Sequence, residues 1–289
     1  MIVDWLIAPF LDYAFMARAL AGGLAVSLGA APVGVFLMLR RMSLTGEAIA
    51  HGVLPGIAVA YLLAGLSLFA MTIGGLVAGL LIATLAALVS RVTILREDAS
   101  LASFHLVALS IGVLLVSVAG SKVDLIHVLF GSVLALGDDA VLLLAGSATL
   151  TVVLLALVYR PLVMECYDPA FLRAVGGRGA LVHHLFLALV VLNLVAGFHA
   201  LGTLMSVGMM ILPATAARFW ARGIGGMIAA AVAGAVFSAV VGLLISFHVD
   251  VPSGPAIILT AGAVSLFSML LGPYGSLRAL RTPAWHLSN

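Results

Sequence analysis

Long apolar runs dominate this sequence of 289 residues and decide what it can fold into. Many of them approach or exceed the roughly 18 residues that mark a membrane-spanning helix, and they are too long for the strands of a membrane barrel. Lipid offers no partner to unpaired backbone groups, so these runs must be helical. The expected fold is all-α: a polytopic integral membrane protein with about nine spans in one domain, residues 1–289. We place the spans at roughly 16–39, 45–65, 67–90, 100–120, 139–159, 183–199, 202–219, 225–247 and 255–273. The span at 45–65 begins with polar residues, so a partly re-entrant segment is an alternative there.

The basic residues predict the orientation of these spans. Of the 13 lysines and arginines, all but Arg18 and Lys122 fall on one side of the nine-span arrangement. Basic residues concentrate on the cytoplasmic side of membrane proteins. We therefore expect an external N-terminus and a cytoplasmic C-terminus. The first residues lack the basic region of a cleaved signal peptide, and Trp5 and Tyr13 are typical anchors of an interfacial segment.

One short stretch, Arg40–Gly56, combines charge with an apolar setting. Glu47 and His51 are four residues apart and share one face if the stretch is helical. A carboxylate oxygen and a neutral imidazole nitrogen can bind a divalent transition metal when other groups complete the shell. Ionisable residues within a membrane are functional candidates. The alternative is an interfacial pair that faces water or pairs with itself.

Further polar residues are candidates for the pathway of an ion. Asp124 and Asp250 fall in two outward loops, 121–139 and 247–255, which line a vestibule, touch an external partner or are ordinary solvated loops. His105, early in the fourth span, is either a buried hydrogen-bonded side chain or faces the pathway. His183 and His184 are adjacent, so they diverge by about 100° on a helix and do not form one ligand pair.

The longest inward loop, 160–184, contains a predicted short helix. Asp168 followed by Pro169 is typical of a helix start, with an N-cap and then proline at the first helical position. Gly176 and Gly177 are typical of its end. A helix of about 168–176 in a chain with so little soluble mass indicates a docking element, or else a segment lying on the lipid surface.

Several function classes lack their residues in this sequence. No P-loop surrounds the single lysine, and neither an H-E-x-x-H nor a G-x-S-x-G motif is present. The lone Cys166 can form neither an intrachain disulfide nor a multi-thiolate metal site. No basic tract rich in aromatics indicates nucleic acid. The chain is therefore expected to be neither an enzyme nor an ATPase.

Six segments resemble the permease subunits of metal-ion (zinc, manganese or iron) ABC importers. The signature is GVFLMLRRMSLTGEAIAHGVLPGIAVAYLL (34–63). It continues through REDAS (96–100), VDLIHVLFGSVLAL (123–136), ECYDPAFLRAVG (165–176), ALGTLMSVGMMILPATAAR (200–218) and DVPSGPAIIL (250–259). The acidic residue of the family's acidic-x3-His pair is commonly aspartate, and Glu47 stands in its place in this chain.

The resemblance implies the type II ABC importer transmembrane fold in a bacterial cytoplasmic membrane. It implies a homodimer with the pathway on its twofold axis, two ATPase subunits that bind ATP underneath, and a separate solute-binding protein outside. The predicted loop helix would be the coupling helix that sits in the ATPase, and the residues expected to make that contact are Asp168, Pro169, Phe171, Leu172 and Arg173.

The resulting hypothesis is import of Zn²⁺, Mn²⁺ or Fe²⁺ past Glu47 and His51, with the ion as cargo and no cofactor held by this chain. Ligands of oxygen and imidazole do not choose among these metals. Two alternatives stay open: a secondary transporter driven by an ion gradient, in which buried carboxylates titrate, and an ABC permease for a metal chelate, which needs a wider cavity.

Overall fold

The computed structural model describes residues 2–65, 67–118, 133–168 and 179–275, which are helical almost throughout and contain no strand. This confirms the all-α expectation. The helices are α1 (Ile2–Asp12), α2 (Ala14–Leu39), α3 (Ser43–Gly52), α4 (Leu54–Ala64), α5 (Leu68–Val92), α6 (Glu97–Val118), α8 (Asp138–Tyr167), α10 (Gly179–Leu201), α11 (Thr203–Ala217), α12 (Ile224–Val249) and α13 (Ser253–Leu271), with a short 3₁₀ turn η1 (Val133–Ala135).

Eight of the described helical segments are long and apolar enough to cross a membrane. One of them, Ser43–Ala64, consists of α3 and α4 in succession. The remaining predicted span, 202–219, corresponds to α11, which has 15 residues. At 1.5 Å per residue α11 is about 22 Å long, less than the roughly 30 Å of a hydrocarbon core. The prediction of about nine spans therefore becomes eight long crossings and one short helix.

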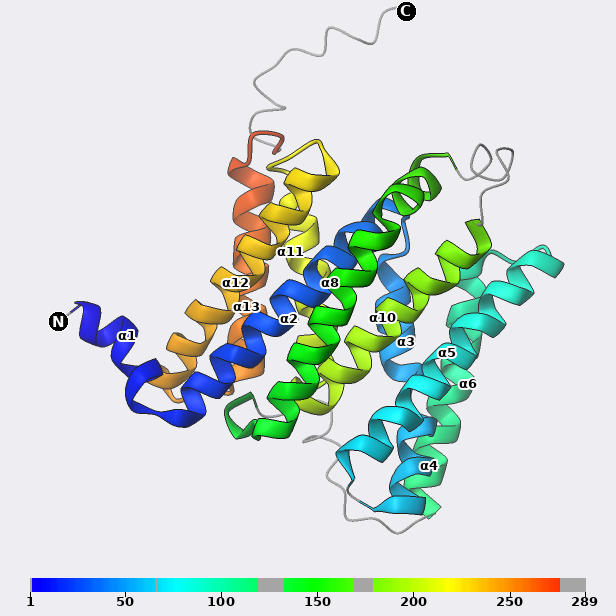
Figure 1. Cartoon of the computed structure of the whole chain (residues 1–289), viewed down its shortest axis with the longest axis horizontal. Helices are drawn as coiled ribbons and strands as arrows, with labels where there is room; N and C mark the ends of the chain where they lie inside the picture. The colour runs from blue at the N-terminus through cyan, green and yellow to red at the C-terminus, as the bar shows by residue number, and fades with distance from the viewer. Residues whose placement is uncertain (1, 66, 119–132, 169–178, 276–289) are drawn as a thin grey trace, which may run out of the picture.

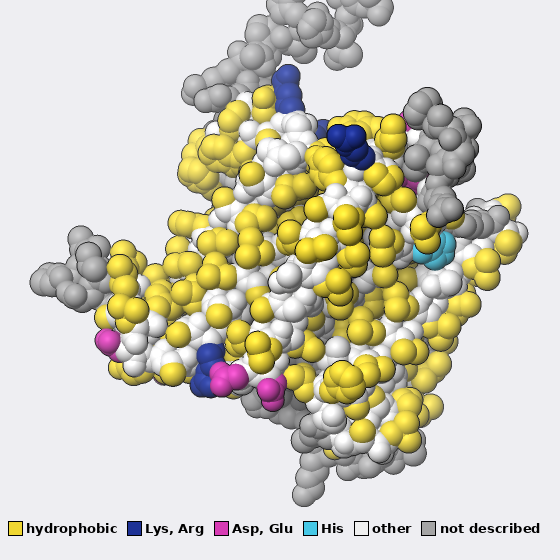
Figure 2. Space-filling model, viewed as in Figure 1, with side chains coloured by type: hydrophobic (Ala, Val, Ile, Leu, Met, Phe, Trp, Pro, Cys, Tyr) yellow, Lys and Arg dark blue, Asp and Glu magenta, His cyan; other side chains and the backbone are white. Residues whose placement is uncertain are grey.

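The helices alternate in direction, so the bundle has two distinct ends (Figure 1). At the first, which we call the Arg40 end, α2, α5, α8, α11 and α13 finish and α3, α6, α10 and α12 begin. At the second, the Asp250 end, α12 finishes and α8 and α13 begin. Figure 2 shows a flank that is mostly hydrophobic between two ends where the charged side chains gather. This is the side-chain distribution of a membrane-spanning bundle.

Helices α2 and α10 form the centre of the bundle. Their most apolar windows are 72% buried, against 22% for α6 and α8. Small residues let the central helices approach closely. A Cβ at Gly34 of α2 would collide with the backbone carbonyl of Met210 in α11, whereas a Cβ at Gly225 of α12 would meet open space.

Helix α8 corrects the predicted boundary of the long inward loop. The expected span ended at 159, but α8 continues through Pro161 to Tyr167, and α10 already begins at Gly179. Arg160 marked the end of the apolar run, yet a charged residue does not end a helix whose last turns can leave the lipid. The connection is therefore 168–178 rather than 160–184.

The N-terminal segment forms α1, which contacts the end of α12. Trp5 and Tyr13 are both exposed. The indole of Trp5 stacks on the imidazole of His248 with centroids 4.0 Å apart and planes 6° apart. An exposed Trp on this short apolar helix, and an exposed Tyr between it and α2, agree with the predicted interfacial segment.

Candidate functional site

Helix α3 carries both predicted metal ligands, Glu47 and His51, so the helical spacing on which the prediction rests is confirmed. The chain reverses before α3 at Arg41, which has a φ of 58°. The helix is interrupted after Gly52, and Pro55 explains the interruption. Proline lacks an N–H, and its ring crowds the carbonyl four residues earlier, which is that of His51. The crossing is thus divided into two helices immediately after the histidine.

The two side chains lie on the side of α3 that is turned away from the bundle centre. Glu47 is exposed in the single chain and His51 is half-buried, whereas Ile49 and Ala50 between them are buried. The Nδ1 atom of His51 is buried and has no hydrogen-bond partner. An exposed carboxylate on an apolar transmembrane helix is costly unless something besides lipid covers it.

A hollow of about 480 Å³ between α3 and α6 brings further polar groups to Glu47. Asp98 and His105 of α6 line it together with Glu47. His105 is half-buried, its Nδ1 is buried without a hydrogen-bond partner, and its Cβ lies close to Gly52 at the end of α3. The structure therefore places His105 beside the predicted site. Asp98 was not among the predicted site residues, because nothing along the chain shows that it reaches this hollow.

One copy of the described chain does not complete a metal site. Within residues 2–65, 67–118, 133–168 and 179–275, no three His, Cys, Asp or Glu side chains converge closely enough to hold an ion. Most transition metals need at least three or four protein or solvent ligands. Glu47 and His51 are therefore at most part of a ligand set.

Of the two predicted vestibule residues, Asp250 is described, and it lies away from α3. Asp250 follows the last turn of α12, with left-handed φ and ψ of 57° and 46°, and its side chain is exposed. It lies at the opposite end of the bundle from the start of α3 (Figure 1). Asp124 lies outside the described residues.

Of the predicted docking residues, the structure describes only Asp168. It caps the C-terminus of α8 and is exposed. Pro169, Phe171, Leu172 and Arg173, and with them the short helix predicted at about 168–176, lie outside the described residues.

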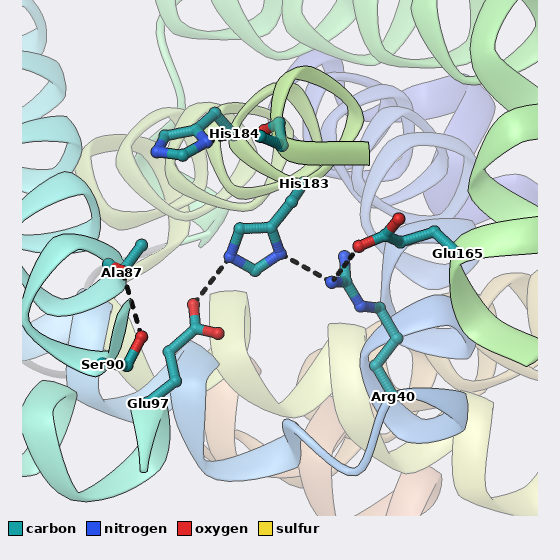
Figure 3. Close-up of polar contacts among 8 residues, drawn as sticks. Arg40, Ala87, Ser90, Glu97, Glu165, His183 and His184 are labelled. Atoms are coloured by element: carbon teal, nitrogen blue, oxygen red, sulfur yellow. Dashed lines mark hydrogen bonds and ion pairs between the residues drawn. The ribbon is translucent and has the colours of Figure 1, made fainter. Parts of the chain in front are cut away.

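A polar cluster at the Arg40 end was not predicted (Figure 3). An Nη2 atom of Arg40 lies 2.6 Å from Nδ1 of His183, and Nε2 of His183 lies 2.8 Å from a carboxylate oxygen of Glu97. Glu165 lies 3.8 Å from the same guanidinium nitrogen. The Nδ1 atom of His184 instead contacts the carbonyl oxygen of Ala180 in its own helix.

An all-α bundle with many apolar crossings defines a polytopic integral membrane protein. The comparisons with known proteins name its family. The model of the ABC 3 transport family matches residues 12–272, so the chain belongs to that family of ABC transporter permeases.

Individual relatives cover almost the whole chain. The manganese import system permease protein ScaB of Streptococcus parasanguinis is 32% identical, over 93% of this chain and 96% of its own length. The manganese transport system membrane protein MntB of Synechocystis is 31% identical, over 94% of this chain and 88% of its own. A probable iron transport system membrane protein of Haemophilus influenzae is 29% identical, over 92% of this chain and 96% of its own length.

Solved structures share the fold. PsaBC from Streptococcus pneumoniae, solved in complex with Fab, superposes with a TM-score of 0.85 at 31% identity, covering 98% of this chain and 100% of that chain. A metal-chelate type ABC transporter in an inward-facing conformation superposes with a TM-score of 0.70 at 16% identity, over 92% and 85% of the two chains, and shows the fold alone. The expected family resemblance is thereby confirmed.

Proposed function

We propose that this chain is the membrane permease subunit of an ATP-driven importer of a divalent transition metal ion, with Mn²⁺ first among the candidates. Two of the relatives above are named for manganese and one for iron. Zn²⁺ remains a competing ion, because oxygen and imidazole ligands bind all three and zinc more tightly than manganese. ATP would be bound and hydrolysed by a separate subunit, and this chain supplies the pathway.

The observation that carries the proposal is an incomplete ligand set on an exposed face. Glu47 is exposed on α3, and His51 and His105 have buried nitrogens without a hydrogen-bond partner, yet these side chains do not converge into a three-ligand site within the described part of one chain. A second copy related by a twofold axis would bring another carboxylate and imidazole to the same place. A site shared by two copies can open when they move apart, as a transport site must.

The distribution of arginines supports the orientation. Seven arginines of the described ranges lie toward the Arg40 end (Arg40, Arg41, Arg91, Arg96, Arg160, Arg218 and Arg222), and Arg18 lies at the other. By the positive-inside rule the Arg40 end faces the cytoplasm. A solute-binding protein would then deliver the ion at the Asp250 end, with Asp250 and Asp124 near its path, and segment 168–178 would meet the ATPase.

The mechanism follows from this placement. The ion loses water as it reaches Glu47 and His51, passes the hollow lined by His105, and leaves toward the Arg40 end. Closure of the ATPase subunits would move segment 168–178 and the two helices it joins as rigid bodies. No residue needs to carry covalent chemistry for this cycle.

The test is Mn²⁺ uptake by proteoliposomes that contain this chain, its ATPase subunit and internal ATP. Glu47→Gln keeps the shape and removes the charge, so we expect uptake to fall at least tenfold. Asp12→Asn, which neutralises an exposed carboxylate at the end of α1, is the matched control and should leave uptake unchanged.

Wild-type uptake by Glu47→Gln and by His51→Leu would contradict the assignment of the site. Transport by the chain alone, driven by an ion gradient without the ATPase, would favour a secondary transporter. Transport of a chelated metal but not of the free ion would favour a chelate permease.

A further inference from the structure

The cluster around His183 joins four helices at the Arg40 end. Arg40 caps α2, Glu97 begins α6, Glu165 lies in the last turn of α8, and His183 lies in the second turn of α10. His183 is 6% exposed. Figure 3 shows its ring between the guanidinium of Arg40 on one side and the carboxylate of Glu97 on the other.

The chemistry of the partners fixes the direction of both hydrogen bonds. A guanidinium can only donate, so Nδ1 of His183 must accept from Arg40. Nε2 then carries the proton and donates it to the carboxylate of Glu97. A neutral imidazole thus bridges a cation and an anion and holds the ends of α2, α6 and α10 in one relative position.

Arg40 also has a second arrangement available. Its Nη2 atom is 3.8 Å from Oε1 of Glu165, while its Nη1 atom and Oε2 of Glu165 are both buried without a hydrogen-bond partner. Arginine and carboxylate pair most strongly through two parallel N–H···O bonds. A small relative movement of α8 and α10 would let Arg40 exchange His183 for a two-bond pair with Glu165.

The position of the cluster in the chain indicates what this exchange of partners by Arg40 would do. Glu165 and His183 stand on either side of segment 168–178, which the proposed function assigns to ATPase contact. Arg40 comes three residues before α3, which carries Glu47, and Glu97 is the residue before Asp98 in the hollow. The cluster therefore connects the two helices that flank the docking segment to the two helices that line the ion site.

We propose that His183 is a positioning residue that couples movement of the ATPase-docking segment to α3 and α6 through the exchange of Arg40 between His183 and Glu165. This rests on the proposed function. The residue touches no ion, and acts by holding Arg40 and Glu97 until α8 and α10 move.

The experiment measures Mn²⁺ taken up per ATP hydrolysed in proteoliposomes of the permease with its ATPase subunit. His183→Phe keeps a ring but removes both polar atoms, so we expect the ratio to fall at least fivefold. His183→Gln restores one acceptor and one donor and should recover at least half of the wild-type ratio. A role in folding alone would change the amount of assembled complex and not the ratio. His184→Phe is the matched control, because the hydrogen bond of His184 goes to the carbonyl of Ala180 in its own helix, and this variant should keep the wild-type ratio.

An unchanged ratio in His183→Phe, including a proportional fall of uptake and hydrolysis, would overturn the proposal. If that variant does not assemble, the same ratio of Mn²⁺ uptake to ATP hydrolysis measured for Glu165→Gln tests the proposal. This substitution removes the charge of the alternative partner while leaving the His183 bonds, and an unchanged ratio there would overturn the exchange. Glu47→Gln in the same preparation separates the two ideas. If it abolishes uptake while the His183 and Glu165 variants keep the wild-type ratio, only the coupling proposal fails. If it transports normally, the proposed ion site fails.

Discussion

Polar side chains at the two ends of the bundle are held in different ways. At the Arg40 end, Arg40 and Glu165 are only 11% and 13% exposed, and His183 makes two contacts shorter than 3 Å. At the Asp250 end, Arg18 and Asp138 lie 3.4 Å apart and are 41% and 82% exposed. Exposed ion pairs contribute about 0–1 kcal/mol, whereas unpairing a buried charge costs about 3–5 kcal/mol.

This contrast indicates that the two ends of the bundle have different roles. The Arg40 end fixes the relative positions of four helices through groups that have little access to solvent. The Asp250 end leaves its charged groups available to water and to whatever binds there. Substitutions at the two ends should therefore differ in size by several fold, and that difference can be measured.

The largest effect is expected from Arg40→Met. Methionine fills much of the volume but donates no hydrogen bond, so Glu165 is left as a buried unpaired charge and the contact with the Phe186 ring, 5.2 Å from the guanidinium carbon, is lost. The free energy of unfolding should fall by about 3–5 kcal/mol. SDS titration in mixed micelles measures it. Arg41→Met, at the exposed neighbour, is the control, and an equal loss in both variants would remove the contrast.

A smaller effect is expected from His248→Ala at the Asp250 end. The substitution removes the stacking on Trp5 and a 3.2 Å contact from Nε2 to the carbonyl of Trp5. A stacked ring pair is worth about 0.5–1.5 kcal/mol, and the exposure of this one places it near the lower limit. Backbone hydrogen exchange in α1 should become several times faster, while exchange in α2 should not change. Unchanged exchange in α1 would show that the stack does not hold the helix.

The smallest effect is expected from Arg18→Met, which breaks the exposed pair with Asp138. Its cost should stay below about 1 kcal/mol in the same SDS titration. Raising the salt concentration should weaken the wild-type pair and bring the two proteins closer together. A loss of unfolding free energy as large as that of Arg40→Met would mean that the ion pair at the Asp250 end stabilises the protein as much as the cluster at the Arg40 end.

The sequence allowed the spans to be placed within a few residues, because the length of an apolar run and the charges that bound it are local properties. It also predicted that Glu47 and His51 share a helix, since spacing alone decides that. It misplaced the end of α8, because Arg160 and Pro161 are typical boundary residues but α8 continues through both.

The cluster of Arg40, Glu97, Glu165 and His183 had no such local signal. These residues are separated by 18 to 143 positions and meet only because four helices pack together. For His183 the sequence predicted only that it forms no ligand pair with His184, because adjacent residues diverge by about 100° on a helix. Likewise, the position of His105 beside Glu47 depends on how α6 packs against α3, which no periodicity in either segment specifies.

The division of one crossing into α3 and α4 has a mechanical consequence. Helix α4 is fastened to α5 where Gly56 meets Gly74, since a Cβ on either glycine would strike the backbone carbonyl of the other. Among the described residues, α3 shares no such pair of glycines with α5, and it is joined to α4 through Val53. Val53 is thus the junction between a half of the crossing that is packed backbone to backbone against α5 and a half, carrying Glu47, that has no such contact, so we expect any tilt within this crossing to move Glu47 rather than α4.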